Sequence, residues 1–180
     1  EGNRYDTSVA AQIVVGKYGY HLPIYRQQDY FAGSGWRPER STLLNILAGA
    51  AYVLEPLYRH YADFVRTSPV VSTDETKVIL LLPAEVPQPQ EGDARSQRVH
   101  EVLSAARAEG KPHVSARMWV YRGLSGQAAN VFDFTVSRHR DGPQQFLEHY
   151  SGTLLGDCYS GFESIVLASD SRLLRAACHA

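Results

Sequence analysis

The sequence is poor in cysteine, carries no excess of either charge and contains no long apolar run. Only Cys158 and Cys178 occur in its 180 residues, too few for a disulfide framework or a zinc cluster, so a reducing cytoplasm is the expected compartment. Lysine and arginine number 18 against 19 acids, which excludes a chain that binds nucleic acid through a uniformly basic surface. No apolar run approaches the about 20 residues of a membrane span, which excludes an integral membrane protein.

Two further absences concern nucleotide binding and the chain ends. The sequence has no glycine-rich loop of the P-loop type, so nothing in it supports ATP or GTP hydrolysis. It begins with Glu1 instead of Met, shows no signal peptide, and stops at Ala180 directly after an apolar stretch. We therefore interpret both ends as cuts through a longer protein that has N-terminal and C-terminal parts not contained here.

The residues that are present predict a globular chain whose first part is helical. Hydrophobic residues make up 44% and charged residues 21%, which is enough apolar material for a core. Apolar spacing predicts helices over 8–18 and 23–31, then a turn over 32–38. Ser41 or Thr42 is the expected N-cap of a long amphipathic helix that reaches Val65 and bends at Pro56.

From residue 69 the pattern changes to β-branched and apolar segments that alternate with short helices. The segment 69–82 predicts one strand, or two short strands bent around Asp74. A polar insertion follows over about 84–115, with a helix over about 93–108. Further strands are expected at 117–122, 130–137, 152–157 and 173–177, and further helices at 143–149 and 162–169. The predicted fold class is α/β (α+β): a helical part, 1–68, followed by a mixed β-sheet core, 69–180, that is incomplete at its C-terminus. The aromatic residues of the second and third strands, Trp119, Tyr121, Phe132 and Phe134, are expected in the sheet core.

Two acids in the predicted sheet are candidates for metal binding. Asp74 interrupts an apolar strand, and Asp157 follows another strand directly before a turn. A carboxylate in a strand is costly unless it is paired or binds a cation, and oxygen ligands favour Mg²⁺ or Mn²⁺. Two such ions can activate a nucleophile and stabilise the leaving oxygen in phosphodiester chemistry. The alternative is structural: Asp74 caps a bend, and Asp157 serves the turn before Tyr159.

Six short motifs, in order along nearly the whole chain, resemble those of IS66-family transposases. Residues 17–28 (KYGYHLPIYRQQ) are similar to the family segment KYxxHLPLYRQ, and Gly35 with 40–43 (RSTL) to its G…STL segment. The other matches are 74–76 (DET), 118–121 (MWVY, for LWVY), 155–162 (LGDCYSGF, for LQxDGYxGY) and 177–180 (ACHA, for the start of CWAHxRR). Cys158 stands where the family has glycine, and 84–115 is longer and more polar than expected between DET and LWVY.

The resemblance implies an RNase H-like core with a DDE triad. Its first two acids correspond to Asp74 and Asp157, and its third, a Glu, lies beyond Ala180. The core order β, β, β, α, β, α, β expected from the pattern is also the RNase H-like order. The implied activity is Mg²⁺- or Mn²⁺-dependent DNA strand cleavage and strand transfer, with transposon ends and target DNA as partners and a homo-oligomer as the active complex. The implied location is the bacterial cytoplasm at the nucleoid. Because one ligand is missing, we expect the 180-residue piece alone to be inactive.

Several other residues are candidates for supporting roles. Helices from Pro23 to about Leu54 could form a DNA-binding helix-turn-helix or a scaffold packed on the core. The residues proposed to contact DNA phosphates are Lys17, Arg26, Arg37, Arg40, Arg138 and Arg140. Glu75 is expected to point to the face of the strand opposite Asp74 and to support the metal ligands without binding the metal. His179, which follows the last predicted strand, is expected in the same supporting role. The alternatives to a transposase are a non-catalytic DNA-binding or assembly module, a decayed transposase remnant, and an RNase H-like nuclease.

Overall fold

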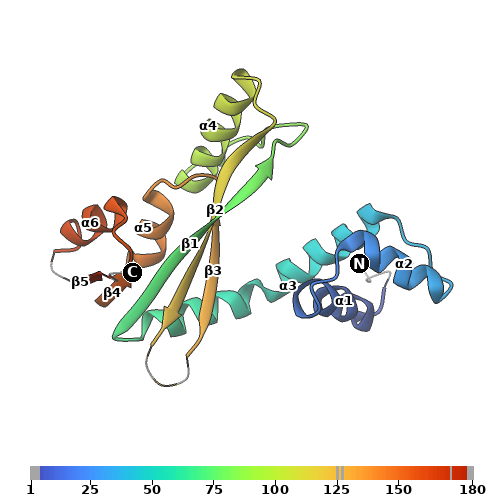
Figure 1. Ribbon diagram of the computed structural model, residues 1–180, viewed down its shortest axis with the longest axis horizontal. Helices are drawn as coiled ribbons and strands as arrows, with labels where there is room; N and C mark the ends of the chain where they lie inside the picture. Colours follow the sequence, from blue (N-terminus) through green and yellow to red (C-terminus); the bar gives the residue numbers. More distant parts are fainter. Residues whose placement is uncertain (1–4, 125, 127, 171, 178–180) are drawn as a thin grey trace. The chain divides into compact units, whose positions relative to one another are not determined.

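The computed structural model describes residues 5–124, 126, 128–170 and 172–177. The chain divides into two compact units, Glu1–Arg59 and His60–Ala180, and each is described here by itself (Figure 1). None of the described helices is both long enough and apolar enough to cross a membrane.

The first unit consists of short helices around a small buried centre. They are α1 (Thr7–Val14), the π-helical turn η1 (Val15–Gly19), α2 (Ile24–Gly33) and the first part of α3 (Arg40–Arg66). The centre contains the buried side chains of Ile13, Gln27 and Leu43. Gln27 is polar but satisfied, because its amide donates to the carbonyl oxygens of Ile13 at 3.3 Å and Leu22 at 3.2 Å.

The beginning of α3 corrects one prediction. The helix begins at Arg40, so neither Ser41 nor Thr42 is its N-cap. The carbonyl of Glu39 already accepts a hydrogen bond from the amide of Leu43, so the helix starts two to three residues earlier than a cap at Ser41 or Thr42 would allow. Pro56 lies inside α3, and the helix continues through it to Arg66.

The second unit is built on a five-stranded mixed sheet. Its strands are β1 (Val70–Leu81), β2 (His113–Gly123), β3 (Asn130–Thr135), β4 (Gly152–Gly156) and β5 (Leu173–Ala177). The strand order is β3-β2-β1-β4-β5; β1, β2 and β3 are antiparallel neighbours, and β1, β4 and β5 are parallel. The helices are α4 (Ala94–Ala108), α5 (Asp141–Leu147) and α6 (Ser160–Leu167) (Figure 1). The mixed α/β class predicted from the sequence is confirmed.

The structure decides between the two alternatives for 69–82 and changes one strand boundary. The single strand is confirmed: β1 runs through Asp74 without a break, because every residue from Val71 to Leu81 pairs in register with β2. β2 begins at His113, inside the segment 84–115 predicted as an insertion. β2 is longer than the strand predicted from the sequence. Its first residues, before Arg117, pair only with β1, because β3 begins its pairing with β2 at Arg117.

In the described part of the second unit, two separate apolar clusters pack helices against the sheet. The larger one packs α5, α6 and the end of α3 against the sheet around the fully buried side chains of Trp119, Tyr121 and Tyr150. The smaller one packs Leu103 and Ala106 of α4 against Val114 of β2. The insertion therefore has its own small core at the outer end of the β1–β2 hairpin.

Strand β3 overturns the prediction that Phe132 belongs to the core. Phe132 is 56% exposed, whereas Val131, Asp133 and Thr135 are buried. The two polar residues can face inward because each has a partner: Arg95 pairs with Asp133, and Trp119 donates its indole N–H to the Thr135 hydroxyl at 2.9 Å. Strand alternation then places Phe132 on the opposite face.

Candidate active site

Asp74 lies in the middle of β1 and faces solvent. Its neighbours Thr73 and Glu75 point to the other face of the strand, where Thr73 is buried and the Glu75 side chain is only 7% exposed. The Asp74 Oδ1 atom accepts a hydrogen bond from the backbone amide of Glu75 at 2.8 Å. The second carboxylate oxygen of Asp74 is therefore not engaged by this contact.

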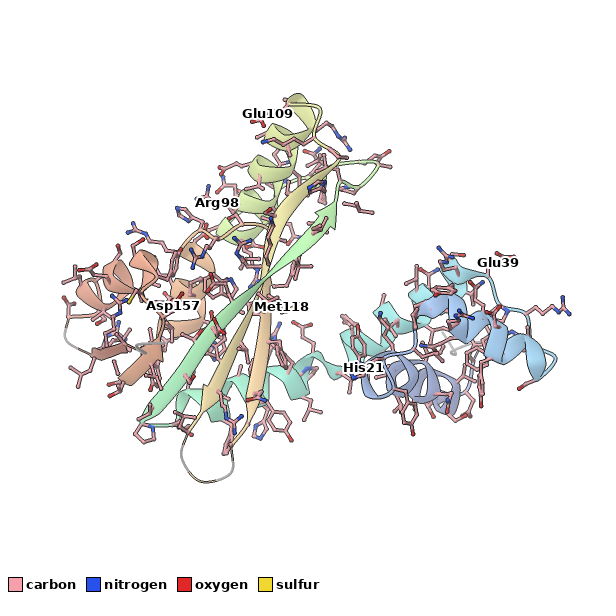
Figure 2. The ribbon with its side chains drawn as sticks, viewed as in Figure 1. His21, Glu39, Arg98, Glu109, Met118 and Asp157 are labelled. Carbon is pink, nitrogen blue, oxygen red and sulfur yellow. The ribbon has the colours of Figure 1, made fainter. Side chains whose placement is uncertain are left out.

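Asp157 follows β4, the parallel neighbour of β1. Ser72 pairs with Leu155 in the register of these strands, and Asp74 and Asp157 each lie two residues further along. Neighbouring strands are about 4.8 Å apart, so each acid lies two residues beyond a pair of adjacent positions, with Asp157 one residue past the end of β4. Asp157 is labelled in Figure 2. It is half exposed, and its Oδ1 atom accepts a hydrogen bond from the amide of Tyr159 at 3.0 Å.

The carboxylate oxygens of these two acids are candidate donors for a cation. Mg²⁺ is typically bound by one or two protein carboxylates and completes its shell with water, so the donor chemistry of Asp74 and Asp157 suits Mg²⁺ or Mn²⁺. Among the described residues, no group of three or more His, Cys, Asp or Glu side chains is arranged to hold a metal ion.

Arg138, in the loop between β3 and α5, connects the acid-bearing segments. Its Nε atom donates to Oε1 of Glu75, and its Nη2 atom lies 3.6 Å from Oδ2 of Asp157. Its guanidinium stacks over the ring of Tyr159, with 4.6 Å to the ring centroid. The Tyr159 hydroxyl in turn donates to the backbone carbonyl of Arg138. The Glu75–Arg138–Asp157–Tyr159 network thus joins β1, the β3–α5 loop and the turn after β4.

Tyr159 remains a hydrogen-bond donor in this network. Burial raises the pKa of its hydroxyl above the ordinary value, although the positive charge of Arg138 acts in the opposite direction. The protonated hydroxyl can therefore keep its bond to the Arg138 carbonyl. Its ring also contacts the core, since it lies 5.2 Å from the ring of Phe162.

Sequence reasoning named Arg138 only as a residue for DNA phosphates and missed its role as the partner of Glu75. One signal was available: strand alternation predicts that Glu75 points inward beside the exposed Asp74, and a buried carboxylate needs a cation. The sequence does not say which arginine supplies it, because Arg138 is 63 residues away.

The other predicted basic residues are distributed over both units. Arg140 is exposed and immediately precedes α5. In the first unit, Arg26, Arg37 and Arg40 are exposed and Lys17 is half-buried; the guanidinium of Arg26 lies 5.3 Å from the ring centroid of Tyr25. His179 lies outside the described residues.

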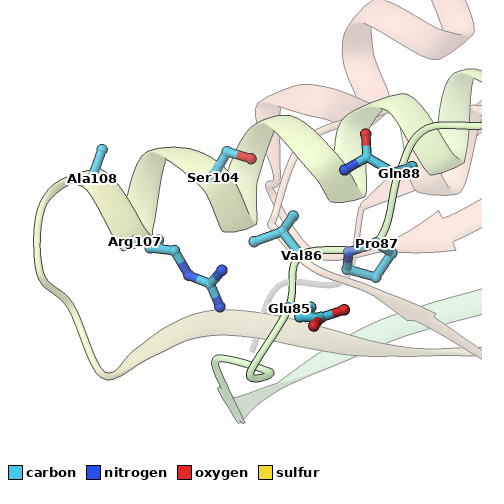
Figure 3. A pocket seen from close by; sticks show the side chains of 7 residues that line it. All are labelled: Glu85, Val86, Pro87, Gln88, Ser104, Arg107 and Ala108. Atoms are coloured by element: carbon cyan, nitrogen blue, oxygen red, sulfur yellow. The ribbon is translucent and has the colours of Figure 1, made fainter.

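A separate open hollow lies between α4 and the segment that follows β1 (Figure 3). It is lined by Glu85, Val86, Pro87, Gln88, Ser104, Arg107 and Ala108. Arg107 is already engaged there, because its Nη2 atom donates to the carbonyls of Pro83 and Ala84. Seven residues of β1 separate Asp74 from Leu81, about 23 Å at about 3.3 Å per residue, so this hollow is remote from the acids.

Comparison with known proteins gives the family. The sequence model of the Transposase IS66 family matches residues 2–180. Two uncharacterized proteins of Sinorhizobium fredii are similar: y4jD is 31% identical over 92% of this chain and 29% of its own length, and y4hP is 26% identical over 96% of this chain and 28% of its own length. The chain therefore spans less than a third of these relatives. No solved structure matches it. Because the family match covers nearly the whole chain, the chain belongs to the IS66 transposase family.

Proposed function

We propose that His60–Ala180 is part of the RNase H-like catalytic core of a DDE-type DNA transposase, with Asp74 and Asp157 as two of its metal ligands. The observation that carries the proposal is the parallel register of β1 and β4, in which the two acids follow the same paired positions, Ser72 and Leu155. The element order β, β, β, α, β, α, β, with α4 added between β1 and β2, also supports it.

In this proposal each residue has a defined task. Asp74 and Asp157 present carboxylate oxygens to Mg²⁺ or Mn²⁺, and bonds from the amides of Glu75 and Tyr159 orient them. The bound ions would supply Lewis-acid activation of a phosphodiester and of the attacking oxygen. Arg140 and the basic residues Lys17, Arg26, Arg37 and Arg40 contact DNA phosphates. The third acid belongs to a part of the protein beyond Ala180, transposon ends and target DNA are the substrates, and the complete enzyme acts as a homo-oligomer at the bacterial nucleoid.

The first test measures metal binding by the 180-residue chain. We expect Asp74→Asn and Asp157→Asn each to lower Mn²⁺ affinity at least about 10-fold, since changes to outer-sphere partners alone cost about 10- to 100-fold. Electron paramagnetic resonance of free Mn²⁺ gives the affinity. Glu163→Gln is the matched control, because Glu163 is an exposed acid of α6 close in sequence to Asp157. If both Asp variants bind Mn²⁺ as wild type does, these acids are not the ligands.

The second test measures DNA cleavage by the full-length protein. Mg²⁺-dependent nicking of transposon-end DNA should be lost in Asp74→Asn and in Asp157→Asn, while DNA binding persists. A full-length protein that binds transposon ends but does not nick them with Mg²⁺ or Mn²⁺ would favour a DNA-binding or assembly module instead.

A further inference from the structure

Glu75 is a nearly buried carboxylate, and among the described residues its cationic partner is Arg138. Its side chain is 7% exposed, and Oε1 accepts a hydrogen bond from Nε of Arg138. Its other oxygen, Oε2, is buried and has no hydrogen-bond partner among the described residues. A buried charge that loses its partner is strongly destabilising, so the ion pair between Glu75 and Arg138 is important for the stability of the folded chain.

Asp157 lies near the same guanidinium but interacts with it more weakly than Glu75 does. The distance from Nη2 of Arg138 to Oδ2 of Asp157 is 3.6 Å, and the two side chains are 45% and 49% exposed. Ion pairs at this distance between solvent-exposed groups contribute little. The Tyr159 ring under the guanidinium further limits where Arg138 can move.

If Glu75 no longer bound Arg138, the guanidinium could form a close ion pair with Asp157. A guanidinium carries five donors in a planar fork and binds carboxylates through two parallel bonds where geometry allows. Bound in this way to Asp157, it would occupy the oxygens that a metal ion needs. The position of Arg138 therefore decides whether Asp157 is open to a cation.

We propose that Glu75 is a positioning residue that keeps the Arg138 guanidinium at its long 3.6 Å contact with Asp157, short of a close two-bond pairing, and so keeps the Asp157 carboxylate open to a divalent metal ion. This inference rests on the proposed function of Asp157 as a metal ligand. Glu75 does not touch the metal in this arrangement; it acts through Arg138.

The test compares Mn²⁺ affinity of the 180-residue chain in three variants. Glu75→Met removes the charge and both acceptors while keeping a side chain of similar length, and we expect Mn²⁺ affinity to fall about 10-fold, the scale on which outer-sphere partners act. The double variant Glu75→Met/Arg138→Met removes the competing guanidinium as well, and its affinity should return to the wild-type value or above. Glu163→Gln again controls for the loss of one acid.

Two results of this Mn²⁺ comparison would overturn the inference. If Glu75→Met binds Mn²⁺ as wild type does, Glu75 has only a structural role. If the double variant stays as weak as Glu75→Met, Glu75 is itself a ligand or Arg138 supports Asp157 directly. The double variant buries no charge, so it remains informative if Glu75→Met does not fold. Failure of the proposed function gives a different pattern, in which wild type and Asp157→Asn bind Mn²⁺ equally.

The interaction between Arg138 and Asp157 can also be measured without metal. Urea denaturation of Arg138→Met, Asp157→Asn and their combination gives the coupling between the two residues. We expect nearly additive midpoint shifts when Glu75 is present and clearly non-additive shifts in the Glu75→Met background, where Arg138 has moved to Asp157. Additive shifts in both backgrounds would show that Arg138 does not move, which contradicts the inference.

Discussion

The Arg95 guanidinium lies 2.5 Å from the carboxylate of Asp133 and thereby fastens helix α4 to strand β3. The Asp133 side chain is 9% exposed, and the same Arg95 nitrogen also donates to the carbonyl of Phe134. The inserted helix is thus tied to the sheet at its N-terminal end by a charge pair and along its length by the Leu103 cluster.

Replacing Arg95 tests this attachment. Breaking a buried pair costs about 3–5 kcal/mol, and because Arg95 is 40% exposed we expect Arg95→Met to lower the free energy of unfolding by about 1–3 kcal/mol. Urea denaturation followed by circular dichroism measures it. Arg59→Met is the control, since Arg59 and Glu55 form an exposed pair within α3 that contributes about 0.3–0.5 kcal/mol. Equal losses in the two variants would mean that the Asp133 carboxylate is not held by Arg95.

A methyl group at Gly142 is expected to disrupt the contact between α5 and β3. A Cβ atom there would overlap the Thr135 methyl group, and Thr135 cannot turn away because its hydroxyl binds both Trp119 and the Ser137 carbonyl. Overpacking of this kind costs about 1–3 kcal/mol, so Gly142→Ala should lower the urea midpoint.

The matched glycine substitution should have the opposite sign. Gly49 lies inside α3 with open space where a Cβ would be, and Gly49→Ala should stabilise the helix by about 0.5–1 kcal/mol. Thermal denaturation of both variants checks the pair. A neutral Gly142→Ala would show that α5 can move away from β3 at no cost.

Leu103 should be essential to α4 and less so to the rest of the unit. It is 3% exposed in the smaller apolar cluster, and truncating a buried leucine costs about 2–5 kcal/mol. We expect Leu103→Ala to speed hydrogen exchange of the α4 amides more than of the amides around Trp119, because the two clusters are separate. Leu81→Ala, at a 71% exposed position, should change exchange little. Uniform acceleration across both clusters would show that they unfold as one.

Asp141 should make stability depend on pH in the acid range. Burial raises the pKa of its carboxyl, but hydrogen bonds from Arg98 and His139 outweigh burial, so the pKa lies below the ordinary value. The unfolded chain then binds the proton more readily, and the stabilisation is complete above the ordinary pKa of about 3.9 and is lost as pH falls through the lower folded value.

Substitution removes this dependence. Asp141→Asn should flatten the rise in unfolding free energy between about pH 2 and pH 5, measured by urea denaturation at several pH values, relative to the exposed-acid control Glu163→Gln. An unchanged slope in Asp141→Asn would mean that Arg98 and His139 do not stabilise its ionised form.

Local sequence patterns predicted most of the secondary structure, but they predicted the wrong buried face for strand β3. The strand at 173–177 and the helix over 94–108 agree with the expected ranges because apolar and capping residues act over a few neighbours. In β3 the alternation of Phe132 and Phe134 with Asp133 and Thr135 predicted the aromatic face as the buried one, and this was wrong. Polar residues face inward there because Arg95 and Trp119, from distant segments, satisfy them.

The candidate site divides in the same way. The sequence by itself determined that Asp74 and Glu75 lie on opposite faces of a strand, since side chains alternate, and that Asp157 lies where another strand ends. The tertiary structure gives the parallel register of β1 and β4, and it alone decided that Arg138 meets both Glu75 and Asp157. Pairing between segments far apart in the chain leaves no periodic trace in the sequence, because it depends on how the strands come together around the shared core.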